Sequence, residues 1–85
     1  MTTTTPIQVT QEYKEIADSN NVSALTIHNQ TCSRLEIYIG EDSPENNSRG
    51  IYIKGHDERL YSGFTGKIYV RGLSSKPQTI VVIAS

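Results

Sequence analysis

The chain has 85 residues, of which 35% are hydrophobic, and a formal net charge of −1 from 8 basic and 9 acidic side chains. A chain of this length has room for one domain with one small hydrophobic core. The small net charge, without any block of like charge, argues against a nucleic-acid partner and against a membrane partner bound through charge.

The first six residues, MTTTTP, are polar, and we expect residues 1–6 to form a flexible arm ahead of a single β domain over residues 7–85. Pro6 biases Thr5 toward extended backbone. The arm has neither the basic region nor the apolar region of a signal peptide. No apolar run in the chain approaches the roughly 18 residues that a membrane span needs.

The segment IQVTQEY alternates between apolar and polar residues, which is typical of a half-buried strand. Its apolar residues share one face and are Ile7, Val9 and Tyr13. Ile16 and Ala17 fall out of this phase, which predicts a bulge near Lys14–Glu15. The alternative is a helix that starts at Thr10, but it would last only about two turns, which is short for a helix.

Two clear strands follow the turn sequence DSNN. ALTIHN places Leu25 and Ile27 inward. RLEIYIG places Leu35, Ile37 and Ile39 on one face, and Arg34, Glu36 and Tyr38 on the other. The eleven residues that start at Gly40, GEDSPENNSRG, predict a long loop. Because exposed loops often carry binding residues, Glu41 and Asp42 are candidate interface residues.

The rest of the chain alternates short β-forming runs with turn sequences. In order these are IYIK, GHDE, RLYS, GFTG, KIYVRG, LSSKP and QTIVVIA. KIYVR and TIVVI are expected to be neighbouring strands. With about seven short strands at regular spacing, the chain is predicted to be all-β, as a small antiparallel β-sandwich or jelly-roll-like barrel.

Three of the strands place a tyrosine between β-branched residues, so Tyr38, Tyr52 and Tyr69 should face away from the core. Tyrosine is common on strands, which is one explanation of the pattern. The other is an exposed contact face, because tyrosine is enriched at protein interfaces. On this second interpretation the three tyrosines are candidate interface residues, together with Ile7 and Val9 beside the arm.

Residues that carry chemistry are few. GFTGK lacks the spacing of a phosphate-binding loop and has Ile68 where a hydroxyl is needed. His28, Cys32 and His56 are one side chain short of a structural zinc site. Cys32 could pair with a histidine as a nucleophile, but Arg34 is the one cation close to it in the sequence. We therefore expect no metal, no cofactor and no enzymatic activity, with Cys32 half-buried.

The order of segments resembles small all-β virion structural proteins of tailed bacteriophages, which include head-decoration, head-fibre-base and tail-associated proteins. The resemblance covers residues 9–84 and runs through ALTIHNQT, LEIYIGEDSPEN, GIYIKG, GKIYVRG and QTIVVIA. Two segments depart from the family pattern: the loop EDSPENNSRG is longer, and GHDERLYSG is more charged. Because of these departures, the resemblance does not define which surface contacts a partner.

The resemblance implies a module without catalytic residues that binds the major capsid protein or other virion proteins, located in the virion and made in the host cytoplasm. It also implies a homo-oligomer, with a trimer favoured, and an arm that contacts the particle. A tail or neck component is one alternative, and a small phage-encoded inhibitor of a host protein is another. A carbohydrate-binding module is a weaker third, because the chain has no Trp and Phe64 is its only Phe.

Overall fold

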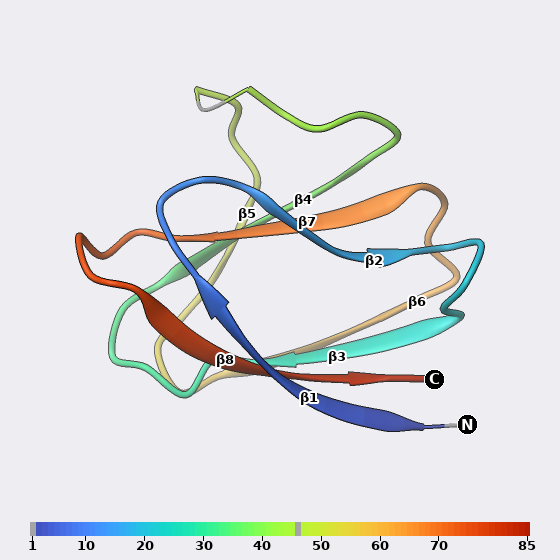
Figure 1. The fold of residues 1–85 in the computed structure, drawn as a ribbon, viewed down its shortest axis with the longest axis horizontal. Helices are drawn as coiled ribbons and strands as arrows, with labels where there is room; N and C mark the ends of the chain where they lie inside the picture. Colours follow the sequence, from blue (N-terminus) through green and yellow to red (C-terminus); the bar gives the residue numbers. More distant parts are fainter. Residues whose placement is uncertain (1, 46) are drawn as a thin grey trace.

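The computed structural model describes residues 2–45 and 47–85, and these residues form eight β-strands (Figure 1). The strands are β1 (Thr3–Val9), β2 (Lys14–Asp18), β3 (Ala24–His28), β4 (Leu35–Gly40), β5 (Ile51–Ile53), β6 (Glu58–Ser62), β7 (Lys67–Gly72) and β8 (Gln78–Ala84). In this described part of the chain, no helix is long and apolar enough to cross a membrane.

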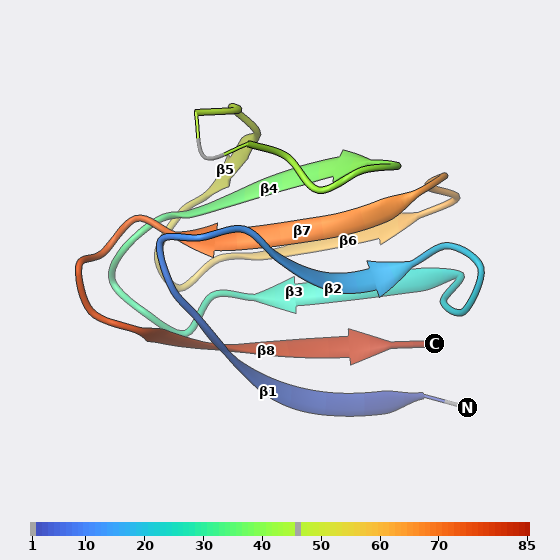
Figure 2. The same ribbon diagram turned by 45° about the horizontal axis from the view of Figure 1, so that its top comes forward.

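The strands form two antiparallel sheets, which we call sheet A (order β1-β8-β3-β6) and sheet B (order β2-β7-β4-β5) (Figure 2). The first strand pairs with the last, the second with the last but one, β3 with β6, and β4 with β5. The chain is therefore one long hairpin rolled up into two layers, which is the topology of a jelly roll. The predicted all-β sandwich or jelly-roll-like fold is confirmed.

The strand count differs from the prediction at the N-terminal end, where one strand was expected over residues 7–13. The chain leaves sheet A after Val9 and enters sheet B at Lys14, so this stretch supplies parts of two strands. A register shift lies between Glu15 and Ala17, close to the predicted bulge. The short helix weighed as an alternative is absent, because residues 14–18 are strand β2.

The flexible arm predicted for residues 1–6 is wrong for Thr3–Pro6, which pair with Val81–Ala84 as the first half of β1. Met1 lies outside the described residues. Pro6 lacks an amide hydrogen, and a strand tolerates this when it lies at the edge of a sheet, as β1 does.

KIYVRG and QTIVVIA do not pair, contrary to the expectation of neighbouring strands. They are β7 and β8, which lie in opposite sheets because residues 73–77 cross between the layers. β8 lies between β1 and β3, so the C-terminal strand completes a sheet of its own chain.

The core lies between the sheets and follows the predicted alternation. Leu25 and Ile27 are buried on β3, whereas Thr26 and His28 face outward. Each fully buried aliphatic side chain contributes about 1.5–3 kcal/mol relative to exposure. The buried cluster consists of Val9, Ala17, Leu25, Ile27, Leu35, Ile37, Ile53, Ile68, Val70, Ile80 and Val82.

Candidate interaction surface

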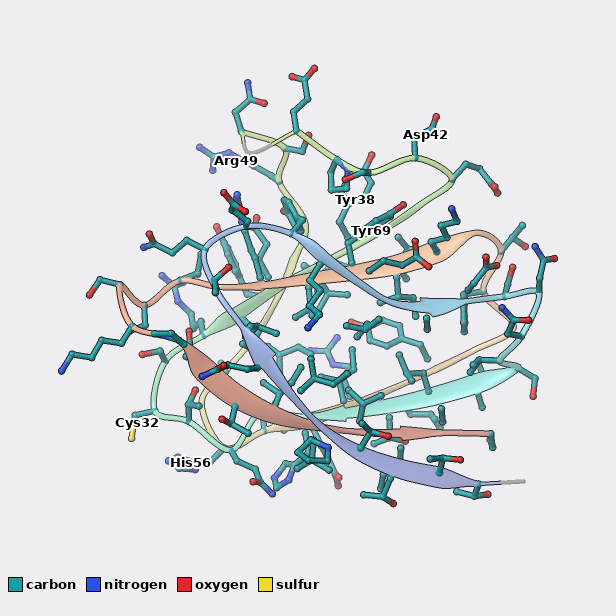
Figure 3. All side chains as sticks on the ribbon, in the orientation of Figure 1. Cys32, Tyr38, Asp42, Arg49, His56 and Tyr69 are labelled. Carbon is teal, nitrogen blue, oxygen red and sulfur yellow. The ribbon has the colours of Figure 1, made fainter. Side chains whose placement is uncertain are left out.

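Tyrosines gather on the outer face of sheet B, and we call Tyr13, Tyr38, Tyr52 and Tyr69 the tyrosine face. Tyr38 and Tyr69 are opposite each other across β4 and β7, with ring centroids 6.5 Å apart (Figure 3). Tyr13 meets Tyr38 edge to face at 6.0 Å. Tyr13 was predicted on the same face as Ile7 and Val9. It lies instead on the outer face of sheet B, against Tyr38, because the chain leaves sheet A after Val9.

Exposure divides the three tyrosines that the sequence singled out. The expectation that Tyr69 is exposed is wrong, since it is only 4% exposed. Tyr38, which contacts both Tyr13 and Tyr69, is half-buried. Tyr52 is 42% exposed and has the Arg34 guanidinium 4.8 Å from its ring centroid. Of the three, Tyr52 is the one that a partner can reach most readily.

A buried ion pair lies beside the tyrosines. The Arg71 guanidinium donates to the Glu36 carboxylate at 2.7 Å from Nε and lies 2.6 Å from it at Nη2, and the Gly50 amide donates to the other oxygen at 2.8 Å. Glu36 is 1% exposed. Burial alone would raise the pKa of Glu36, but the hydrogen bonds from Gly50 and Arg71 and the Arg71 charge outweigh it, so the pKa lies below its usual value.

The same groups attach the long loop to the sheet. The Tyr13 hydroxyl donates to the Ser48 carbonyl at 2.9 Å, and Arg71 Nη2 donates to it at 3.2 Å. The Arg71 guanidinium also lies 4.3 Å from the Tyr13 ring centroid. Burial, with the nearby Glu36 charge, raises the pKa of Tyr13. We call this set the loop clamp: Tyr13, Glu36, Ser48, Gly50 and Arg71.

Glu41 and Asp42 lie at the start of the long loop and are exposed, as predicted for docking residues. Figure 3 shows Asp42 and Arg49 on the part of the chain that projects beyond sheet B. A role in binding stays a prediction for both acidic residues.

Ile7 and Val9 are placed differently from the prediction of an interface near the arm. Val9 belongs to the buried core, and Ile7 is partly buried and packs against that core. The reason is that β1 is a strand of sheet A, so its alternate side chains point between the layers.

Exposed apolar side chains occur on β5 and β6, the strands that end the two sheets, and we call these strands, with the end of β4, the open edge. Leu60 on β6 is 63% exposed and Ile51 on β5 is 52% exposed. β5 pairs only with Leu35–Ile37, so among the described residues no strand pairs with Tyr38–Gly40 on that side. The exposed apolar residues of the open edge are Ile39, Ile51, Tyr52 and Leu60.

Sequence reasoning missed Leu60. The signal was present, because Leu60 alternates with Arg59 and Tyr61 and is the only large apolar residue in the outward phase of RLYS. An apolar residue that a strand points toward water is a recognised mark of a contact surface when others lie near it.

Cys32 and His56 come together at the opposite end of the strands from the long loop. Cys32 Sγ lies 3.5 Å from His56 Nε2, and both residues are exposed, so the expectation of a half-buried cysteine is wrong. His28 lies next to Gln30 instead. Across the described residues, no group of three or more His, Cys, Asp or Glu side chains is placed to hold a metal ion.

Buried Asn29 brings these two loops together. Its amide donates to the carbonyls of Ser33 at 2.7 Å and Lys54 at 3.0 Å, and its oxygen accepts from the Thr31 amide at 3.0 Å. The His56 amide donates to the Thr31 carbonyl at 3.1 Å. This role of Asn29 was not predicted, because NQT has the composition of an ordinary turn.

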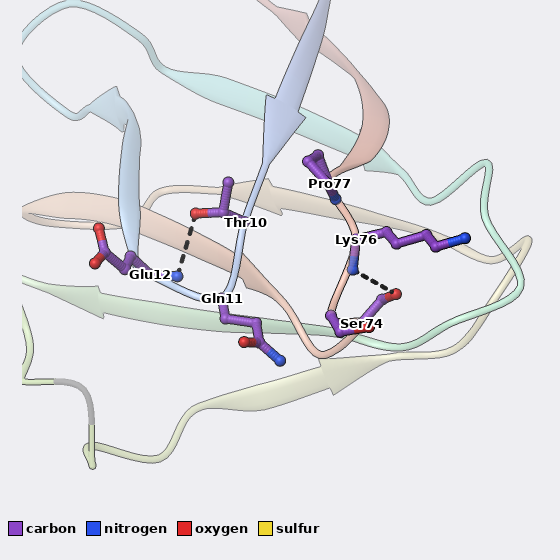
Figure 4. A pocket seen from close by; sticks show the side chains of 7 residues that line it. Thr10, Gln11, Glu12, Ser74, Lys76 and Pro77 are labelled. Carbon is purple, nitrogen blue, oxygen red and sulfur yellow. Dashed lines mark hydrogen bonds between the residues drawn. The ribbon is translucent and has the colours of Figure 1, made fainter.

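A cavity of about 250 Å³ lies where the β1–β2 and β7–β8 connections meet, and the sequence did not indicate it (Figure 4). Local hydrogen bonds shape its walls: the Glu12 amide donates to Thr10 Oγ1 and the Lys76 amide donates to Ser74 Oγ. The lining is polar except for one proline and consists of Thr10, Gln11, Glu12, Ser74, Ser75, Lys76 and Pro77.

Comparisons of the chain with protein-family models, with curated proteins and with solved structures find no match. Its function is therefore inferred from its own surfaces.

Proposed function

We propose that this chain is a bacteriophage virion structural protein, associated with the head or decorating the capsid, that binds the major capsid protein or other virion proteins. The observation that carries the proposal is the open edge, whose strands β5 and β6 carry the exposed apolar residues Ile51, Tyr52 and Leu60. The proposed role is binding, in the virion and as a homo-oligomer. It involves no catalytic residue, metal, cofactor, nucleic acid or membrane.

Burial of the open edge supports a protein partner. Apolar surface contributes about 25 cal/mol for each Å² removed from water, and aromatic residues are enriched at interfaces. Tyr52 is 42% exposed, and a tyrosine combines an apolar ring with a polar hydroxyl, which suits it to a contact with a protein partner.

The jelly-roll topology also supports the proposal, because viral capsid domains use it. Lectins and cupins share the same topology, so the fold by itself is compatible with several functions. The choice of a virion protein among them comes from the resemblance in segment order.

Quantitative mass spectrometry of particles purified from the phage that encodes the chain tests this role. We expect peptides of the chain at a copy number comparable to that of other structural proteins. A chain made in infected cells but missing from washed particles would contradict the proposal, and would favour the inhibitor of a host protein.

A variant links the role to the open edge. Ile51→Lys should lower the copy number in particles, because burying a lysine charge in an apolar contact is costly. Leu73→Lys is the matched control, since Leu73 is exposed but lies in the β7–β8 connection. Equal occupancy for both variants would exclude the open edge as the particle contact.

A further inference from the structure

The four strands that end the two sheets differ in how well they resist pairing with another strand. β1 contains Pro6, β2 contains the register shift after Glu15, and β5 is only three residues long. Proline, bulges, short length and charged side chains are the usual means by which proteins block an exposed edge. β6 has no proline, pairs with β3 in regular register and is five residues long, so of these means it has only the charges of Glu58 and Arg59, which are opposite in sign.

We propose that β6 pairs antiparallel with β6 of a second copy of this chain, around a twofold axis at Leu60. The pairing joins the two A sheets into one continuous sheet. This pairing would be the contact that forms the homo-oligomer of the proposed function. The inference therefore rests on the homo-oligomer in that proposal. Two copies of the same edge form an isologous contact, which closes as a dimer.

The residues of β6 suit this register. Pairing around Leu60 uses the whole strand: Leu60 faces its own copy, Arg59 faces Tyr61, and Glu58 faces Ser62. No like charges are opposite each other, and a guanidinium beside a tyrosine ring is favourable. A register centred on Arg59 would instead place two guanidinium groups face to face.

An unsatisfied group belongs to the same strand, on Tyr61, whose side chain packs against the core. The Tyr61 hydroxyl is buried and has no hydrogen-bond partner among the described residues, and burial raises its pKa. In the proposed pair, Arg59 of the second copy lies on the same face as this hydroxyl and can donate to it. Such a buried polar group is usually satisfied, so a donor from a partner would complete it.

The second sheet supports the same contact. β5 and β6 end their sheets on the same side of the molecule, and a link of only four residues joins them, Lys54–Asp57. Pairing of the two β6 strands therefore brings the two β5 strands toward each other. A stable pair needs about 600 Å² per partner, roughly a ninth of the 5190 Å² surface of this chain.

A trimer built by strand pairing would need a second receptive edge on each copy. The other three edge strands, β1, β2 and β5, each have a feature that blocks pairing. We therefore favour a dimer formed by two β6 strands over the trimer that the resemblance implies.

Sedimentation equilibrium of the purified chain tests the pairing. We expect a species of twice the 9.5 kDa chain mass at micromolar concentration. Leu60→Lys should raise the dimer dissociation constant by about tenfold or more, because it places two ammonium groups at the axis. Leu73→Lys is the matched control and should leave the dimer intact. A monomeric parent chain, a trimer, or a Leu60→Lys variant that dimerises normally would overturn the proposal.

A cysteine at the axis tests the register and does not depend on the lysine variant folding. In a Cys32→Ser background, Leu60→Cys should oxidise to a disulfide-linked dimer, because directly opposite residues bring their Cβ atoms within about 4.5–5.5 Å. Ser62→Cys should not, since its partner is Glu58. Equal cross-linking of both variants, or of neither, would overturn the register. These tests use the purified chain alone, so their failure is distinct from absence of the chain from particles.

Discussion

Glu36 holds a carboxylate where water hardly reaches, and its neighbours explain how. Two Arg71 nitrogens and the Gly50 amide surround its oxygens, and Arg71 in turn reaches the Ser48 carbonyl. A buried pair of this kind contributes little net stability compared with apolar residues of similar size, but removing one partner is costly. A test of the loop clamp must therefore distinguish two free energies: the cost of leaving one charge buried without its partner, and the net contribution of the ion pair to stability.

Arg71→Met should lower the free energy of unfolding by about 3–5 kcal/mol, because the Glu36 carboxylate would remain buried without its guanidinium. The double variant Glu36→Leu with Arg71→Met should lose much less. Urea unfolding followed by circular dichroism measures both. If the double variant is no more stable than Arg71→Met alone, the buried charge is not the source of the loss.

The lowered pKa of Glu36 predicts an acid-dependent loss of stability. A carboxyl whose folded pKa lies below its unfolded value stabilises the fold fully above the unfolded value, here 4.5, and this contribution is lost as pH falls through the folded pKa. We expect the free energy of unfolding to decline below about pH 4.5, and Glu36→Gln to reduce the decline.

Urea unfolding from pH 3 to pH 6 makes this measurement, in approximate steps of one pH unit. Glu15→Gln is the control, because the contact of Glu15 with Lys67 is a surface pair at 3.7 Å. The same acid slope in the Glu36→Gln variant as in the parent chain would contradict the assignment.

At the scale of the strands, β1 pairs with β8 along its whole length, from Thr3 to Val9, so these residues do not divide into an arm and a strand. Deleting residues 2–6 removes the partners of Val81–Ala84 in β8. We expect the free energy of unfolding to fall by about 1–3 kcal/mol, since each ladder hydrogen bond contributes roughly 0.5–1.5 kcal/mol. A thermal or urea unfolding curve measures the change.

Replacing Thr3, Thr4 and Thr5 with serine is the control for the deletion, because it keeps the backbone pairs. An unchanged stability after the deletion would show that these residues do not hold β8. It would also restore the interpretation of residues 1–6 as an arm available to a partner.

Seven of the strands follow from the sequence because alternation identifies which residues of a run share a face. β2 was missed because Lys14–Asp18 is mostly polar and contains the register shift, which breaks the alternation. Strand partners were not predictable in the same way. Alternation assigns faces but not neighbours, so β7 and β8 were taken as a pair although they lie in opposite sheets.

The candidate surface was predicted in part for a similar reason. The direction of Tyr38, Tyr52 and Tyr69 follows from their place in the strands. The burial of Tyr69 does not, because Tyr69 packs against Tyr38 of a different strand, and Tyr38 in turn packs against Tyr13. Glu36 was likewise predicted to point outward, but its burial depends on Arg71 and on the end of the long loop.

The whole molecule is a jelly roll with one well-protected side and one open side. β1 and β2 end the sheets with a proline and a bulge, whereas β5 and β6 end them with exposed Ile51, Tyr52 and Leu60. The proposed association through β6 would extend sheet A and add to the buried surface of a small domain that has no disulfide.

Hydrogen–deuterium exchange of the purified chain at low and high concentration tests this account most directly. Exchange reports the protection of individual amides, so it locates the contact as well as detecting it. The account predicts that amides of Arg59–Ser62 in β6 exchange more slowly as concentration rises, while amides of Thr3–Thr5 in β1 are unchanged. Exchange in β6 that is independent of concentration, or slowing confined to β1, would contradict it.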